Sequence, residues 1–289
     1  MKTSTRTRTP SAHSLRAGPH QVAVDIYGDA GPPVLLLHGI PGDKGIWAEV
    51  AARLRHCQII APDLLGFGDS SEPEGDPHAA GQAAMLAALL EQLGMRSVHV
   101  VGFDFGGPVA VLLAARYPNL VASLTLAATN VLVDTPIPCP LHLVRPPVAG
   151  DLFAHMFFSR PGLSGMWLGA VARRQSFPFS AYRRMLHSAK GVRWTRKIFQ
   201  MSLRDLPGLY APVQTALSGI RTPCQVLWGE RDPFFSRATG ERTARLIPGA
   251  YFQILPGTGH FLPAEDPDRF AAAIAAIASQ GTSGDVWQW

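Results

Sequence analysis

The sequence predicts an α/β fold: a mostly parallel sheet flanked by helices, with a helical cap inserted into the chain. Short apolar runs alternate with segments of helical period from about residue 21 to 131, and the same pattern returns from residue 213 to 280. Between these stretches, five prolines interrupt the chain, and helical segments rich in Phe, Trp and Arg follow to residue 212. With 289 residues, of which 47% are hydrophobic, the chain is long and apolar enough to form a packed core.

The predicted strands and helices alternate along the chain. Strands are predicted at residues 34–37, 58–61, 97–101, 124–128, 224–228 and 251–255. Helices are predicted at residues 79–93 and 267–278, and Gly94 follows the first helix, where a glycine suits a left-handed C-terminal cap. Apolar strands separated by helices are typical of a parallel sheet that is buried on both faces. We therefore predict a core of residues 21–131 and 213–280 and a cap of residues 132–212.

The ends and the charge of the chain indicate its surroundings. Residues 1–20 are basic and rich in hydroxyl groups, and no apolar stretch of the kind found in secretory signals follows, so we expect a flexible arm on a cytoplasmic protein. No apolar run approaches the ~20 residues that span a bilayer. The formal net charge of +5 is spread over single arginines rather than gathered in a stripe. We expect no nucleic-acid partner and no membrane partner, a homodimer is compatible with the sequence, and residues 281–289 form a tail.

The three cysteines, Cys57, Cys139 and Cys224, carry no recognisable motif. They are too few and too scattered for a disulfide framework, and none has a cysteine or histidine at metal-ligand spacing. We interpret them as small buried hydrophobic residues. The sequence predicts no metal site and no organic cofactor.

Asp104 is the candidate nucleophile. It stands at the centre of the segment 102–106, Gly-Phe-Asp-Phe-Gly, after an apolar strand and before a helical run. At such a strand-to-helix elbow, the central residue takes a strained backbone that raises its side chain above the sheet. A carboxylate there displaces a leaving group from a saturated carbon and forms an ester that water then hydrolyses. The alternative is an ordinary turn, since Gly and Asp are common turn residues, but the placement between strand and helix favours the elbow.

His260 is the candidate general base, and Asp232 is the candidate acid that orients it. His260 follows two glycines in a loop after the last predicted strand, and imidazole suits proton transfer near neutral pH. Asp232 follows the strand at 224–228 and would hold the imidazole tautomer. Glu230 is a competing acid, and Asp232 also suits the N-cap of a following helix, a role compatible with catalysis. The chain order of nucleophile, acid and histidine is typical of enzymes with this elbow.

The backbone N–H groups of Ile40 and Phe105 are the candidate oxyanion hole. Ile40 lies in the segment 38–41, His-Gly-Ile-Pro, at the end of the first long buried strand. Its side chain is apolar, so only its backbone can donate a hydrogen bond. These N–H groups would hold the Asp104 carboxylate and later the oxyanion that forms when water attacks the ester.

Together these motifs resemble the α/β-hydrolase superfamily over about residues 21–278. The resemblance rests on His-Gly-Ile-Pro at 38–41, Asp-Leu-Leu-Gly-Phe-Gly-Asp-Ser at 63–70, the Asp104 elbow, Trp-Gly-Glu-Arg-Asp-Pro at 228–233 and Gly-His at 259–260. With an aspartate at the elbow, the chain resembles the branch of this superfamily that contains epoxide hydrolases and dehalogenases. The resemblance implies a covalent ester mechanism without a cofactor.

Within this branch, the resemblance to epoxide hydrolases is the closer one. Haloalkane dehalogenases commonly carry Trp after the nucleophile and Asn in place of Ile40, and fluoroacetate dehalogenases carry Arg after the nucleophile. Phe105 and Ile40 supply none of these groups. Hydrolysis of an epoxide to a diol is therefore the leading interpretation, a haloalkane or haloacid dehalogenase is the alternative, and a non-catalytic receptor of the same fold is the third. A serine esterase is disfavoured, because Ser164 lacks the elbow spacing and lies in the cap.

Epoxide hydrolases usually take a proton donor from the cap. The segment 153–162 resembles the helix that carries the first donor, which makes His155 a candidate, and Tyr210 and Tyr182 are candidates for the second. The side chains predicted to line an apolar pocket are His38, Phe103, Phe153, Met156, Phe157, Phe158, Met166, Trp167 and Phe179. Many cations in the cap would attract a carboxylate, so we expect a small apolar or partly anionic organic substrate, although a solvated helical face explains them as well.

Overall fold

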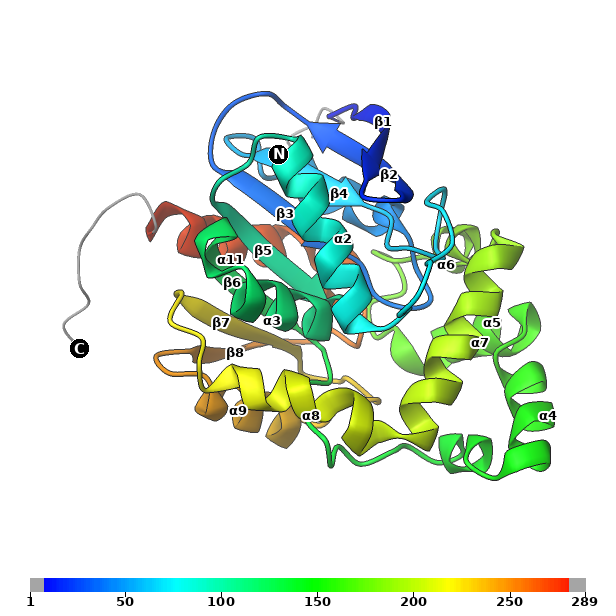
Figure 1. The fold of residues 1–289 in the computed structure, drawn as a ribbon. Helices are drawn as coiled ribbons and strands as arrows, with labels where there is room; N and C mark the ends of the chain where they lie inside the picture. Colours follow the sequence, from blue (N-terminus) through cyan, green and yellow to red (C-terminus); the bar gives the residue numbers. More distant parts are fainter. Residues whose placement is uncertain (1–7, 281–289) are drawn as a thin grey trace.

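The structure of the protein, a computed structural model, describes residues 8–280 and has an eight-stranded sheet at its centre (Figure 1). In chain order the strands are β1 Ser11–Ala17, β2 His20–Tyr27, β3 Pro33–Leu37, β4 Gln58–Pro62, β5 Val98–Phe103, β6 Val121–Ala127, β7 Cys224–Gly229 and β8 Tyr251–Leu255. In space they follow the order β1-β2-β4-β3-β5-β6-β7-β8. The pairings of β2 with β1 and β4 are antiparallel, and every other pairing is parallel. The mostly parallel sheet predicted from the sequence is confirmed.

Helices cover both faces of the sheet. The helices of the core are η1 Lys44–Trp47, α1 Ala48–Ala51, α2 Ala79–Gln92, α3 Gly106–Arg116, η2 Pro118–Leu120, α9 Arg237–Leu246, α10 Leu262–Glu265 and α11 Pro267–Gln280. In β3, Leu35 and Leu37 belong to the cluster under α2 and α3, whereas Val34 and Leu36 belong to the cluster under α1 and α11. Successive side chains of a strand point to opposite faces, so an uninterrupted apolar run fills both clusters.

A cap is inserted between β6 and β7. Its helices are η3 Leu141–Val144, α4 Pro147–Phe157, α5 Arg160–Ala170, α6 Phe179–Met185, α7 Ala189–Arg204 and α8 Leu206–Leu217. In Figure 1, α4, α5, α6 and α7 lie together at one end of the molecule, and α8 returns to the sheet. The predicted cap boundary at residue 212 falls inside α8, because Val213 and Leu217 continue the helix into the core cluster.

The prediction of a flexible arm over residues 1–20 is wrong where the structure describes that segment. Residues 11–17 form the edge strand β1, which pairs with β2 along its whole length. Arg8 also donates hydrogen bonds to the carbonyl groups of Leu54 and Cys57. Only Ala17 of β1 is buried, so backbone hydrogen bonds hold this strand and its sequence lacks the apolar pattern that predicts one. Residues 1–7 of the arm and the tail at 281–289 lie outside the described residues.

Each predicted strand and helix of the core has a counterpart in the structure, and the differences lie at the ends. The strand at 251–255 matches β8, whereas β5 extends two residues beyond the predicted end at Val101 and so reaches the elbow. Over residues 8–280, no helix combines the length and the apolar character that crossing a membrane would need.

Candidate active site

Asp104 lies on a strained turn between β5 and α3. Its backbone has φ of +50°, in the left-handed region that residues other than glycine rarely adopt. A Cβ atom at Gly106 would lie 2.4 Å from the Leu37 carbonyl oxygen, and one at Gly102 would lie 2.4 Å from the Gly106 carbonyl oxygen. The turn is therefore closed by glycines that let neighbouring backbones approach, as the sequence predicts for an elbow.

Asp104, His260 and Asp232 are brought together at the carboxyl ends of the parallel strands. Nδ1 of His260 lies 3.0 Å from Oδ2 of Asp232, and Nε2 lies 3.4 Å from Oδ2 of Asp104. Oδ1 of Asp232 accepts hydrogen bonds from the amides of Phe234 and Phe235, which fixes the carboxylate behind the ring. Asp232 is thus both the imidazole partner and a turn cap. Glu230, the competing acid, instead accepts a hydrogen bond from the Gly257 amide.

The charges around His260 favour its protonated form. Burial alone would lower the pKa of His260, but the carboxylates of Asp232 and Asp104, through charge and hydrogen bonds, raise it to about 10. Aromatic rings enclose the imidazole: Phe103 lies 5.4 Å away between ring centroids, and Phe234 lies 4.9 Å away. The site therefore holds one imidazolium between two carboxylates in a largely apolar shell.

The Ile40 amide donates a hydrogen bond of 2.7 Å to Oδ1 of Asp104. This contact is the one predicted for an oxyanion hole, with the carboxylate oxygen in the place that an oxyanion would take. Gly39 makes it possible, because a Cβ at that position would lie 2.4 Å from Cβ of Asp104. The Phe105 amide stays a prediction as the second donor.

An apolar cavity lies between Asp104 and the cap. The core contributes Ile40, Phe105, Phe234 and Phe235, and the cap contributes Met166, Ile198, Phe199 and Leu203. The polar side chains in its lining are Asp104, His260, Asn130, Thr135, Ser202 and Tyr210. Sequence reasoning named only Asp104, Ile40, Phe105, His260, Tyr210 and Met166 among these residues. Phe234 and Phe235 follow Asp232 by two and three residues in the sequence. This closeness to the predicted acid was a signal that both rings line the cavity.

Tyr210 is the candidate cap donor that reaches this cavity. Burial raises the pKa of its hydroxyl to about 12, although hydrogen bonds from Ser202 and Asn130 act in the opposite direction. Ser202 also contacts the buried His78, with 3.2 Å between Oγ and Nε2. Burial lowers the pKa of His78 to about 4, so this imidazole is neutral at pH 7. Tyr210 therefore borders the same cavity as Asp104 as a neutral phenol, and Ser202 links it to the neutral imidazole of His78.

The other two candidate donors do not reach the cavity. His155 lies on the exposed surface of α4, where Nδ1 contacts the Asp151 carbonyl oxygen at 2.8 Å. The helical register of α4 turns His155 outward, because Ala154 is the residue that faces the interior. Tyr182 is buried, but its hydroxyl donates a hydrogen bond of 2.9 Å to the Leu163 carbonyl. These two predictions of a proton donor are corrected.

Most of the predicted pocket side chains lie elsewhere. Phe153 and Phe157 stack on each other within α4, with 5.4 Å between their centroids, and Met156 is exposed. Trp167 donates to the Phe177 carbonyl, Phe179 packs against Trp167, and Phe158 stacks on Phe199. Phe103 packs beneath His260 rather than in the cavity. Both nitrogens of His38 are used by the backbone: Nε2 accepts from the Leu64 amide and Nδ1 donates to the Gly39 carbonyl.

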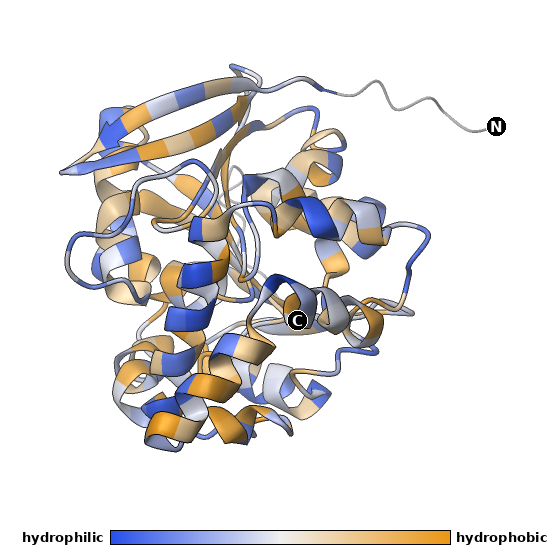
Figure 2. Ribbon diagram, turned by 90° about the vertical axis from the view of Figure 1, so that its right-hand side faces the viewer, coloured by the Kyte–Doolittle hydropathy of each residue, from blue (hydrophilic) through white to orange (hydrophobic). Residues whose placement is uncertain are grey.

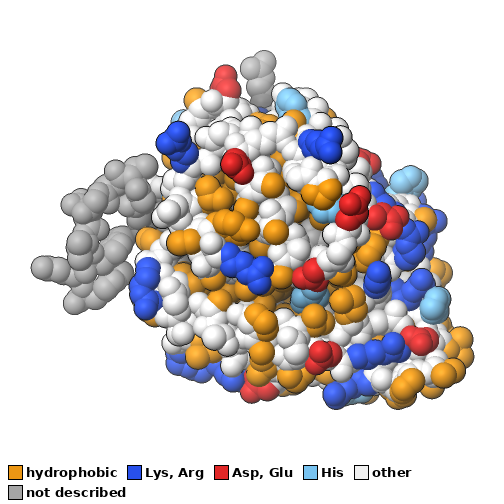
Figure 3. Space-filling view, in the orientation of Figure 1, with side chains coloured by type: hydrophobic (Ala, Val, Ile, Leu, Met, Phe, Trp, Pro, Cys, Tyr) orange, Lys and Arg blue, Asp and Glu red, His pale blue; other side chains and the backbone are white. Residues whose placement is uncertain are grey.

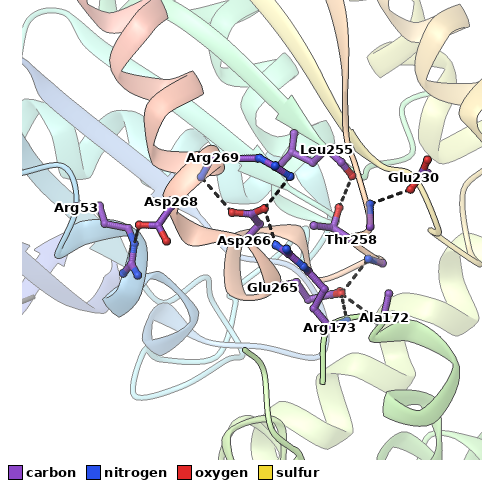
Figure 4. A network of polar contacts seen from close by, with 12 residues as sticks. Arg53, Ala172, Arg173, Glu230, Leu255, Thr258, Glu265, Asp266, Asp268 and Arg269 are labelled. Atoms are coloured by element: carbon purple, nitrogen blue, oxygen red, sulfur yellow. Dashed lines mark hydrogen bonds and ion pairs between the residues drawn. The ribbon is translucent and has the colours of Figure 1, made fainter. Parts of the chain in front are cut away.

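Glu265, which sequence reasoning missed, ties the cap to the loop that carries His260 (Figure 4). Its side chain is fully buried and accepts four backbone hydrogen bonds, from Gly259 and Phe261 on either side of His260 and from Ala172 and Arg173 of the cap. The His260 amide in turn donates to the Ala170 carbonyl. A glutamate directly after the apolar segment 261–264 and two residues before the proline that starts α11 was the available signal, but it also fits an ordinary helix start.

Asp266, the next residue, strengthens the same connection. It forms an ion pair of 2.6 Å with Arg173 of the cap and contacts Arg269 of α11 (Figure 4). Two consecutive carboxylates therefore hold residues 172–173 against the histidine loop. Among the residues that the structure describes, no group of His, Cys, Asp and Glu has an arrangement that could hold a metal ion.

Comparisons with known proteins agree with this architecture. Residues 32–181 match the model of a family described as alpha/beta hydrolase fold. The chain is 28% identical over 277 residues to "Lipase 1" of Psychrobacter immobilis, covering 92% of this chain and 83% of that protein. It is 28% identical over 251 residues to "Haloalkane dehalogenase 2" of Mycobacterium bovis, covering 84% of this chain and 87% of that protein.

Solved structures show the same fold. "Epoxide hydrolase CorEH without ligand" superposes with a TM-score of 0.77 at 21% identity, covering 94% of this chain and 99% of that one. A haloalkane dehalogenase loop variant from Bradyrhizobium elkanii superposes with a TM-score of 0.76 at 24% identity, covering 95% of this chain and 100% of that one.

Proposed function

The chain belongs to the alpha/beta hydrolase fold family, and we propose that within this family it hydrolyses epoxides to diols through a covalent ester on Asp104. The observation that carries the proposal is that Asp104, His260 and Tyr210 all border one apolar cavity, while Asp232 holds the far side of the His260 ring. An apolar cavity with a few convergent polar groups suits a small organic substrate.

The first step is attack by Asp104 on a ring carbon of the epoxide. Oδ1 is held by the Ile40 amide, which leaves Oδ2 as the attacking oxygen. A carbon–oxygen bond of the ring breaks as the ester bond forms, and Tyr210 donates its proton to the departing oxygen. The product of this step is a hydroxyalkyl ester of Asp104.

The second step is hydrolysis of that ester. Once the ester has removed the charge of Asp104, the His260 imidazolium returns a proton to the Tyr210 phenolate by way of solvent. The neutral ring, held by Asp232, then accepts a proton from a water molecule, which attacks the ester carbonyl carbon. The carbonyl oxygen is the former Oδ1, so the Ile40 amide stabilises the oxyanion that develops there. Collapse of this intermediate breaks the bond to the alkyl oxygen, which takes the proton back from His260 as the diol leaves. The carboxylic acid left on Asp104 then gives its proton to His260, which restores the carboxylate and the imidazolium.

Dehalogenation is the second candidate function, and the similarity to "Haloalkane dehalogenase 2" favours it. It shares the ester on Asp104 but releases a halide ion instead of opening a ring. The residues around the carboxylate weigh against it. Ile40 and Phe105 line the cavity with apolar side chains, so neither side chain can donate a hydrogen bond to a departing halide. Ester hydrolysis fits less well, since a carboxylate that attacks an ester forms an anhydride.

The test is to trap the ester on the enzyme. The His260→Gln variant keeps Asp104 but lacks the base, so it should form the ester and hydrolyse it slowly. We would incubate it with styrene oxide, epoxyoctane and bromohexane and measure the intact mass, followed by peptide mapping. An epoxide adds its whole mass to the peptide that contains Asp104, whereas the halide adds its mass less HBr.

The control is Asp104→Asn in the His260→Gln background, which should carry no adduct. An adduct from bromohexane alone would replace the epoxide proposal with dehalogenation. An adduct on another residue, or turnover of epoxides by Asp104→Ala, would show that Asp104 is not the nucleophile. Absence of both turnover and adduct across a broad panel would favour the receptor alternative.

A further inference from the structure

Helix α4 carries an unpartnered apolar face on the outside of the cap. Val148, Leu152 and Met156 follow one another at intervals of four residues and are 85%, 75% and 66% exposed. Residues at this spacing lie on one side of a helix. We call these three side chains the α4 ridge. Leu143, just before α4, is 53% exposed as well. Adjacent exposed apolar residues of this size mark an interaction surface more often than isolated ones do.

The ridge lies in a positively charged part of the molecule. The cap, residues 132–212, contains eleven Lys and Arg against three Asp and no Glu, whereas the rest of the chain contains fifteen against eighteen acidic residues. Helix α7, which packs beside α4, carries five cations and no acid. The one acid of α4, Asp151, is paired with Arg204 at 2.7 Å. Figure 3 shows hydrophobic side chains beside Lys and Arg at the lower right, where Figure 1 places α4.

The ridge is also close to the cavity. On its inner side α4 packs against η3 and α7, and these two elements contribute Leu141, Ile198 and Phe199 to the cavity lining. Figure 2, which turns the cap toward the viewer, shows hydrophobic and hydrophilic residues next to each other along its helices. A surface in contact with the ridge would therefore lie one helix layer away from the cavity.

We propose that the cap docks peripherally on an anionic lipid bilayer through the α4 ridge. The surface of an anionic bilayer offers partners for both features of this face. Its acyl chains can cover the apolar ridge, and its negative headgroups can pair with the cations of the cap. A second copy of the chain fits less well, because it would oppose one cationic cap with another. A nucleic acid would satisfy the cations but leave the ridge in water. The sequence-based expectation of no membrane partner rested on the length of apolar runs, which concerns spanning and not peripheral contact.

The test uses the full chain and sedimentation with vesicles. One set of vesicles contains phosphatidylglycerol and phosphatidylcholine, and the other contains phosphatidylcholine only. The variant combines Val148→Gln, Leu152→Gln and Met156→Gln, which keeps good helix formers at exposed positions. The matched control combines Val148→Leu, Leu152→Met and Met156→Leu, which keeps the ridge apolar.

We expect the wild type to bind vesicles that contain phosphatidylglycerol at low ionic strength, and to bind phosphatidylcholine much less. The triple Gln variant should partition at least about tenfold less, and the apolar control should stay within about twofold of the wild type. Salt at about 0.5 M should weaken wild-type binding by screening the cations. If circular dichroism shows that the triple variant is misfolded, Leu152→Gln alone replaces it and should give an intermediate loss.

Three results would overturn the proposal. The first is a wild type that does not sediment with phosphatidylglycerol vesicles at low salt. The second is a folded triple Gln variant that binds them as well as the wild type, since the cations alone would then explain the contact. The third is a wild-type dimer, detected by light scattering, that the Gln substitutions dissociate, because a second copy would then be what covers the ridge.

Discussion

The side chain at position 104 determines which bonds this site can attack, and its surroundings give its two oxygens different roles. Oδ1 lies 2.7 Å from the Ile40 amide, whereas Oδ2 lies 3.4 Å from Nε2 of His260. One oxygen is therefore held as a future carbonyl oxygen, and the other faces the cavity and the base. A serine in this position would have one oxygen and would need the histidine to remove its proton.

Replacing Tyr210 with Phe separates the two candidate reactions. Opening an epoxide requires a proton at the ring oxygen, whereas a halide leaves without one, so Tyr210→Phe should slow ester formation from styrene oxide by about 10²-fold and from bromohexane far less. The measurement is the rate of adduct formation in the His260→Gln background. The matched control is Tyr182→Phe, since that hydroxyl is bound to the Leu163 carbonyl. Equal slowing of both substrates by Tyr210→Phe would contradict the role of acid.

Glu265 is expected to position His260 rather than to touch the substrate. Glu265→Ala would leave four backbone donors without their partner, and each buried unpaired donor costs about 1–3 kcal/mol. Glu265→Gln keeps an acceptor for most of them and should restore much of the stability. In the folded Gln variant, ester hydrolysis should slow at least about tenfold while ester formation changes little, because His260 acts in the second step.

Single-turnover kinetics with styrene oxide, together with thermal unfolding, would measure these two effects. A variant that loses stability but hydrolyses the ester at the wild-type rate would limit Glu265 to a structural role. Uniform slowing of both steps would argue against a specific effect on the base.

At the scale of elements, the elbow depends on how closely α3 approaches β3. A Cβ at Gly106 would lie 2.4 Å from the Leu37 carbonyl oxygen, so Gly106→Ala should force the two apart and destabilise the fold by about 1–3 kcal/mol. Activity should fall further, because the displaced turn carries Asp104. Gly165→Ala is the matched control: Gly165 lies inside α5 with nothing within 4 Å of the added Cβ.

The control should gain about 0.5–1 kcal/mol from its helix position, with unchanged activity. Urea unfolding and turnover would be measured for both variants. If Gly106→Ala is as stable and active as the wild type, the close approach is not needed for the elbow.

The elements also show where sequence patterns stop being informative. In α4, apolar side chains occur on every side, so composition does not say that Ala154 faces inward while Met156 and His155 face outward. The α4 residues predicted for the pocket, Phe153, Met156 and Phe157, lie outside the cavity for this reason, since the packing of α4 on η3 and α7 sets its rotation. In β1 apolar side chains are too few rather than too many. This edge strand is held by backbone hydrogen bonds, so its sequence shows no alternation of apolar and polar residues.

Over the whole molecule, the sheet and the Asp104–His260–Asp232 cluster could be predicted because each depends on short sequence patterns. Buried strands, glycine turns and chain order fix where these three side chains emerge. The cavity could not be predicted, because its walls combine β-strand loops with η3, α7 and α8, which meet only in the folded chain. Tyr210 was foreseen from its place near the return to the sheet, whereas Ser202 and His78 were not, because their contact joins residues 124 positions apart.

The pKa of His260 predicts how global stability depends on pH. Its pKa rises from 6.5 to about 10 on folding, so its contribution to the free energy of unfolding is fully present below about pH 6.5 and is lost as the pH rises toward 10. Urea unfolding of the wild type between pH 6 and 10 should therefore show a decline that His260→Gln lacks. Other groups titrate in both proteins, so the difference between the two curves isolates His260. A flat difference would mean that the imidazole is not held as a cation.

The same charges give the proposed reaction an internal order. At neutral pH the free enzyme holds a proton on His260, because two carboxylates flank it, and an imidazolium cannot activate water. Once Asp104 becomes an ester, one of the two negative charges is gone, the hold on that proton weakens, and the ring becomes a base. Formation of the ester bond thus converts His260 into the base that the second step needs. Until a substrate has reacted, the protonated ring of the resting enzyme does not activate water.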